Sequence, residues 1–161
     1  MLAQGVAADG PRTARRALAV DLGERRVGLA ISDAAGRFAL PLAVLARESD
    51  RQVIGEIRTL AATHEVALLV VGEPLAPDGV RGPAAERARR FGERLARATA
   101  RPVRFVDETL TSVAAAELLA ARPATGRRDG RSGRSSRPID AVAAQVILQE
   151  AIDRGLLEDG A

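Results

Sequence analysis

The order of the apolar segments constrains the fold more than any other feature of the sequence. Three strand-like runs come first, at 17–22, 27–33 and about 38–46, and short turns separate them. Such a series favours an antiparallel meander. Helical patterns and short apolar strands then alternate along the chain, which favours parallel pairing. The sequence therefore predicts an α/β protein with one mixed sheet and helices on both faces.

Local signals place the remaining elements. Ser49 and Gln52 form a capping-box pattern at the start of the first helix. Pro41 makes the third strand an edge strand, because proline donates no backbone hydrogen bond. The predicted helices cover about 50–63, a segment beginning at Pro83, a segment ending near 121, and about 138–154. The remaining strands are predicted at 66–71 and 102–106, and the apolar stripe of the second helix at Ala84, Ala88, Phe91, Leu95 and Ala98.

Length and composition limit the classes of protein. The 161 residues, 47% of them hydrophobic, suit one domain over 17–161. Residues 1–16 are expected to be a disordered basic tail, and 122–137 a flexible Arg-rich loop. No apolar run approaches the roughly 20 residues that cross a bilayer, and no secretory signal is present, so we expect a soluble cytoplasmic protein that makes no contact with membranes.

The absence of cysteine restricts the metal chemistry. With no Cys and one His, the chain has no disulfide framework and no Cys/His zinc site. Any bound metal must be held by oxygen ligands, which Mg²⁺ and Mn²⁺ prefer.

The net charge of +3 is unevenly distributed. Residues 1–16 carry +2 and residues 122–137 carry +5, which leaves −4 for the rest of the chain. Basic segments on an acidic body indicate contact with a polyanion, here a nucleic acid. The alternative is that these arginines are merely solvated. The predicted phosphate contacts are Arg127, Arg128, Arg131 and Arg134.

Carboxylates occur where the predicted elements begin or end. Asp21 follows a buried strand, with Gly23 beyond it to admit a ligand, Asp107 and Glu108 follow another strand, and Asp140 lies in the first turn of the last helix. Ligands of open α/β sheets bind at the edge where parallel strands end. Each residue also has a structural explanation, since aspartate is common in turns and near helix N-termini.

Two neighbours of this group were assigned separate roles. Alternation along a strand sends Asp107 and Glu108 to opposite sides. We expect Glu108 to be the ligand, and Asp107 to support it by accepting hydrogen bonds from the start of the following helix. Glu73 is interpreted as a loop carboxylate, with a place in the metal site left open.

Four motifs in order carry a family resemblance: VDLGERRVGLAISD, VVGEPLAPDG, VDETLTSVAAAELL and IDAVAAQVILQ. Together they span about 17–153 and resemble the YqgF/RuvX family of pre-16S rRNA nucleases, also described as Holliday-junction-resolvase-like. The resemblance implies an RNase H-like five-stranded fold, with acidic positions at Asp21, the Asp107–Glu108 pair and Asp140. The chain departs from the family pattern at Glu73, where leucine is usual, and at 109–112, where Arg-x-Thr-Thr is usual.

The leading hypothesis is a metal-dependent phosphodiester hydrolase. Asp21 would bridge two ions about 3.5–4 Å apart, Glu108 and Asp140 would complete their coordination, and a metal-bound water would attack the phosphate. The resemblance implies precursor 16S rRNA as substrate, cut near its 5′ end. Branched DNA remains an alternative substrate, and the need for a ribosomal partner stays open.

The sequence allows two rival functions. A nucleic-acid-binding module without catalysis would follow if the changes at 109–112 had dismantled the site. A phosphate-binding domain of the actin or sugar-kinase type also has an Asp-x-Gly turn after a strand. Such proteins pair two related domains, whereas this chain has no internal repeat.

Overall fold

The computed structural model describes residues 15–108 and 138–158. Residues 1–14 of the predicted tail, the helix predicted to end near 121 and the whole segment 122–137 lie outside the described residues. Within the described part, no helix is long and apolar enough to cross a membrane.

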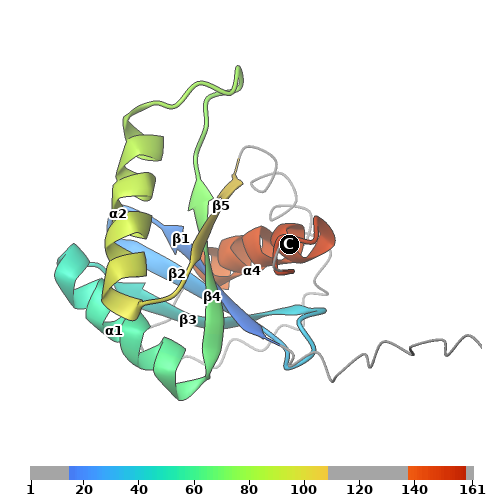
Figure 1. The fold of residues 1–161 in the computed structure, drawn as a ribbon. Helices are drawn as coiled ribbons and strands as arrows, with labels where there is room; N and C mark the ends of the chain where they lie inside the picture. Colours follow the sequence, from blue (N-terminus) through green and yellow to red (C-terminus); the bar gives the residue numbers. More distant parts are fainter. Residues whose placement is uncertain (1–14, 109–137, 159–161) are drawn as a thin grey trace, which may run out of the picture.

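One five-stranded sheet forms the centre of the molecule, in the order β3-β2-β1-β4-β5 (Figure 1). The strands are β1 (Arg16–Leu22), β2 (Arg26–Ser32), β3 (Ala39–Ala46), β4 (Val66–Glu73) and β5 (Val103–Asp107). The first three pair antiparallel, whereas β4 and β5 run parallel to β1. The predicted mixed sheet is therefore confirmed.

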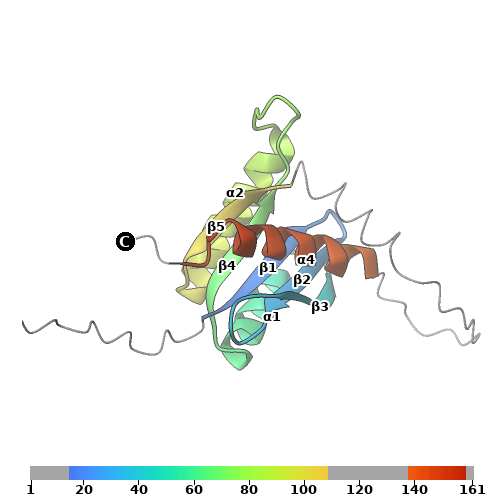
Figure 2. The ribbon, with the colours of Figure 1, turned by 90° about the vertical axis from the view of Figure 1, so that its right-hand side faces the viewer.

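Helices cover both faces of this sheet. The helices α1 (Asp50–Thr63) and α2 (Pro83–Thr99) lie on one face, and α4 (Pro138–Asp153) lies on the other (Figures 1 and 2). Alternate residues of each strand enter two cores. Val20 and Val71 pack toward α1 and α2, while Ala19 and Val70 pack toward α4. This alternation determines which face each strand-end side chain reaches.

The local signals for the helices are largely confirmed. Ser49 caps α1 through its hydroxyl, and the Gln52 side chain returns the bond to the cap backbone, which completes the predicted capping box. Pro83 is the first residue of α2. The predicted stripe of α2 is wrong at Ala84, which is exposed, because the helix turns Ala85 inward instead.

Helix α4 is hydrogen-bonded to the edge strand β3. The predicted edge strand is β3, with Pro41 inside it. Gln149 Oε1 accepts a hydrogen bond from the Ala39 N–H at 3.0 Å, and Gln145 Nε2 donates to the Ala39 carbonyl at 3.0 Å. These bonds set the height of α4 above the sheet.

The parallel strands end at a common edge. In the register of the sheet, Val20 lies beside Val71, and Glu73 lies beside Asp107. The predicted gathering of the strand ends that follow Val20, Val71 and Val106 is thereby confirmed. Strand β4 extends two residues beyond its predicted end and includes Glu73.

Candidate active site

Asp21 is the next-to-last residue of β1 and lies on the α4 face of the sheet. Ala17 and Ala19, at alternate positions before it, belong to the core beneath α4. Its side chain is half-buried. A Cβ on Gly23 would collide with the Arg26 carbonyl oxygen, so the hairpin turn requires glycine at this position. The expectation that Gly23 also lets a ligand approach the backbone stays a prediction.

Glu108 reaches the same face from β5. Its N–H donates to the Glu73 carbonyl at 3.0 Å, which continues the β4–β5 pairing by one residue. Val106, two residues earlier, packs in the α4 core. The carboxyl group of Glu108 lies over Gly72. A Cβ on Gly72 would overlap Glu108 Oε1 and lie 2.7 Å from Ile147 Cδ1 of α4.

The carboxyl groups of Asp21 and Glu108 interact directly. Burial raises the pKa of Glu108 to about 8, and the negative charge of Asp21, a hydrogen bond between the two side chains and the charge of Asp107 add to the effect. The pair thus favours sharing a proton when no cation is near. The combined negative charge is what a divalent cation would neutralise.

Asp107 and Glu108 separate as alternation requires. Asp107 is paired with Glu73 in the register of the sheet, while Glu108 lies beside Asp21. The helix whose N–H groups Asp107 was expected to bind lies outside the described residues. The ligand and supporting roles assigned to these residues stay predictions.

Asp140 occupies the first turn of α4, and its side chain is not among those described. Ala144 and Ile147, four and seven residues later, are fully buried against the sheet. The described side chains by themselves contain no group of three or more metal-ligating residues. They supply the Asp21–Glu108 pair, whose hard oxygen donors and crowded charge fit Mg²⁺ or Mn²⁺. A third ligand from Asp140 is a prediction.

Glu73 takes no part in this pair, and its interpretation as a loop carboxylate is wrong. It is the last residue of β4, is 4% exposed, and lies on the α2 face. Both of its oxygens accept hydrogen bonds from Arg89, at 2.8 and 3.0 Å, and Arg81 lies 2.9 Å away. Arg89 also stacks over the Phe105 ring, 4.5 Å from its centroid.

Sequence reasoning missed two features of the site. Gly72 makes the space for Glu108, and no local pattern around it indicates this. Arg89 binds Glu73, which is 16 positions earlier and beyond the reach of spacing rules within a helix. The four predicted phosphate contacts, Arg127, Arg128, Arg131 and Arg134, lie outside the described residues.

The space at Gly72 can be tested by filling it. Gly72→Ala should push the Glu108 carboxyl away from Asp21 and weaken Mn²⁺ binding at least about tenfold, since displaced groups around metal sites typically cost 10–100-fold. Gly55→Ala is the matched control, because a Cβ there meets nothing within 4 Å. Titration calorimetry measures both. Equal Mn²⁺ affinity in Gly72→Ala and parent would contradict the assigned geometry.

The raised pKa of Glu108 predicts a pH-dependent stability in metal-free protein. The folded state holds this proton more tightly than the unfolded state, so the stabilisation is complete below the ordinary pKa of 4.5 and is lost as pH rises through about 8. The parent loses this stabilisation at high pH, whereas Glu108→Gln cannot ionise. The free energy of unfolding of the variant minus that of the parent should therefore be roughly 1–3 kcal/mol larger at pH 9 than at pH 5. Urea unfolding in EDTA measures this, with exposed Glu48→Gln as control. An equal difference between variant and parent at pH 5 and pH 9 would argue against the buried contact of Glu108 with Asp21.

The Glu73–Arg89 ion pair should contribute to stability in a strongly coupled way. Arg89→Met leaves a buried carboxylate with one remaining arginine and should cost roughly 2–4 kcal/mol of unfolding free energy. Glu73→Leu together with Arg89→Met should recover most of that loss, because no buried charge remains. Denaturant unfolding of both single variants and the double variant gives the coupling energy. Additive losses would show that the two residues act independently.

Comparisons with known proteins agree with this site and fold. A family model described as "RuvX: Holliday junction resolvase" matches residues 15–154. A protein named "Putative pre-16S rRNA nuclease" from Chloroflexus aurantiacus (strain ATCC 29366 / DSM 635 / J-10-fl) is 42% identical over 137 residues, or 84% of this chain and 85% of the relative. Its namesake from Anaeromyxobacter sp. (strain K) is 41% identical over 140 residues, or 86% and 97%.

Among solved structures, "T. thermophilus RuvC in complex with Holliday junction substrate" is similar with a TM-score of 0.57 at 15% identity, covering 88% of this chain and 96% of that one. This likeness confirms the expected RNase H-like fold. The residues matched by the family model include the four motifs on which the resemblance was based. The chain therefore belongs to the RuvX family.

Proposed function

We propose that this protein is a metal-dependent nuclease that processes the 5′ end of precursor 16S rRNA. The observation that carries the proposal is the Asp21–Glu108 pair, gathered at the ends of parallel strands over the space left by Gly72. Membership in the RuvX family and relatives named as pre-16S rRNA nucleases support the same reaction class.

Each acidic residue has a defined part in this proposal. Asp21, Glu108 and Asp140 would hold Mg²⁺ or Mn²⁺, and Asp107 would support Glu108 from the neighbouring position. Bound there, the cation would supply Lewis-acid activation of water and stabilise the charge that develops on the phosphate. The chain's own contribution is rigidity: Asp21 is fixed by a central strand, and Glu108 by its backbone bond to Glu73.

Arginines would bind the phosphate groups of the substrate. Residues 122–137 carry +5, and Arg127, Arg128, Arg131 and Arg134 would neutralise phosphates on either side of the cleaved bond. No side-chain base is needed, because a cation lowers the pKa of water itself. This agrees with the position of the single histidine, His64, which caps the C-terminus of α1.

A second substrate has support of its own. The matching family model is described as a Holliday junction resolvase, so a four-way DNA junction is the alternative to precursor rRNA. Both substrates are phosphodiesters and would use the same carboxylates. The choice between them depends on how the strand is held.

Cleavage of labelled precursor 16S rRNA and of a four-way DNA junction, with Mg²⁺ or Mn²⁺, tests the proposal. Asp21→Asn and Glu108→Gln should each reduce single-turnover cleavage by about a hundredfold or more, since even residues that only orient metal ligands cost 10–100-fold. Glu48→Gln, which changes an exposed carboxylate outside the pair, should cleave as the parent does.

Two results would change the proposal in different ways. Full cleavage by Asp21→Asn would remove the pair from catalysis. Cleavage of the junction alone would replace the rRNA by branched DNA. Circular dichroism of each variant confirms that lost activity does not reflect lost fold.

A further inference from the structure

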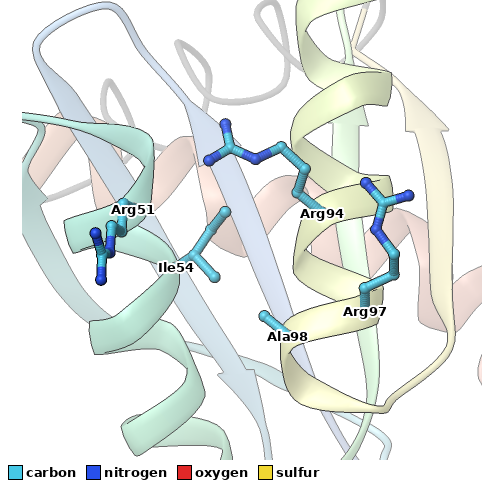
Figure 3. A pocket seen from close by; sticks show the side chains of 5 residues that line it. All are labelled: Arg51, Ile54, Arg94, Arg97 and Ala98. Carbon is cyan, nitrogen blue, oxygen red and sulfur yellow. The ribbon is translucent and has the colours of Figure 1, made fainter.

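A second charged feature lies on the sheet face opposite the Asp21–Glu108 pair. An open hollow of about 430 Å³ lies between helices α1 and α2. Its lining consists of Arg51, Ile54, Arg94, Arg97 and Ala98 (Figure 3). Figure 3 shows Arg94 extending from α2 toward α1, and Ile54 extending from α1 toward α2. The hollow thus has an arginine rim and a small apolar floor.

The rim carries positive charge that the described residues do not neutralise. Arg94 Nη1 lies 3.2 Å from Asp50 Oδ2, and this carboxylate is shared with Arg47. Arg51 and Arg97 are exposed, and no acidic side chain in the described ranges 15–108 and 141–158 forms an ion pair with either. A guanidinium presents a planar set of donors that matches a phosphate group.

The arginines continue along α2 in a regular row. The row consists of Arg87, Arg90, Arg94 and Arg97, and all four are exposed. Spacings of three and four residues keep them on one side of the helix. At 1.5 Å per residue, they span about 15 Å along the axis. A row of this length fits an anion whose charges repeat along a chain better than it fits a single isolated anion.

Side-chain contacts connect this hollow with the turn that follows β1. Arg47 Nη1 donates to the Gly23 carbonyl at 2.7 Å, and its Nη2 lies 2.7 Å from Asp50 Oδ1. Asp50 in turn contacts Arg94. The hairpin next to Gly23 exposes Arg25 and Arg26. Arginines therefore recur from the turn after Asp21, where Glu24 is also exposed, across the start of α1, where Asp50 lies between Arg47 and Arg94, to the hollow.

We propose that this hollow binds the phosphate backbone of the nucleic-acid substrate, in the stretch that flanks the cleaved bond. The proposal rests on the proposed function and adds a contact surface to it. A strand leaving Asp21 over the hairpin would meet Arg51, Arg94 and Arg97 in succession. The lining contains three arginines and no acidic residue, which favours a polyanion as the occupant.

Binding of labelled single-stranded precursor RNA to the full chain in EDTA tests the hollow without cleavage. Arg51→Gln with Arg97→Gln should weaken binding about tenfold and lower the log–log salt slope by about 1.4, or 0.7 for each lost phosphate contact. The matched control is Arg37→Gln with Arg104→Gln, which removes the same charge from two exposed positions outside the hollow. The control should change binding less than about twofold at 0.15 M salt, where exposed charges are screened.

An unchanged affinity and salt slope in the hollow variant would overturn the proposal. So would equal losses in the hollow variant and the control, since these would show only a general effect of net charge. Loss of binding to a polyglutamate peptide, with RNA binding intact, would identify a docking site for an acidic protein and also overturn it.

The result is separable from the proposed nuclease function. Single-turnover cleavage at subsaturating enzyme should fall in the hollow variant about as far as binding does, whereas Asp21→Asn should lose cleavage and keep its RNA binding in EDTA. A parent protein that binds RNA through the hollow but cleaves neither RNA nor DNA would refute the nuclease and retain the hollow. A hollow variant that binds RNA normally and cleaves normally would refute RNA binding at the hollow and retain the nuclease function.

Discussion

Two carboxyl groups held side by side at the end of a buried sheet repel each other once both are ionised, and the site is organised around that repulsion. Parallel strands bring Asp21 and Glu108 to one edge, and Gly72 between them omits the side chain that would keep them apart. Burial and, after it, the negative charge of Asp21 raise the pKa of Glu108, so ionising both groups is costly. Strands β1 and β5 lead to the two carboxylates. Strand β4 between them supplies the space at Gly72 and the Glu73 carbonyl that binds the Glu108 N–H.

Side chains alternate at the end of β4, so the carboxylate pair and a neutralised ion pair lie on opposite faces of the sheet. Gly72 opens toward α4 and the carboxylate pair, whereas Glu73 turns toward α2 and is neutralised by Arg89 and Arg81. Without these arginines, Glu73 would be a buried uncompensated charge. Arg89 neutralises it while stacking on Phe105 of β5, on the face away from the pair.

Local patterns predicted what depends on local physics. The capping box at Ser49, the edge position of β3 and the opposite directions of Asp107 and Glu108 follow from hydrogen-bonding rules and a two-residue period. What could not be predicted depends on partners distant in sequence. Glu73 resembled a loop residue because Arg89, which binds it, is 16 positions away in the sequence. The need for glycine at position 72 becomes clear only when Glu108 is seen to pack against it. The stripe of α2 was displaced at Ala84 because the sheet, and not the helix alone, sets its rotation.

The two glutamines of α4 have a consequence beyond positioning that helix. An outer strand offers unpaired N–H and C=O groups on which another chain can add, and this is a common start of aggregation. At Ala39 both outward groups are already occupied by Gln145 and Gln149, and two residues later Pro41 has no N–H to offer. The beginning of β3 is therefore closed to strand addition by another molecule, which protects an otherwise accessible border of the sheet.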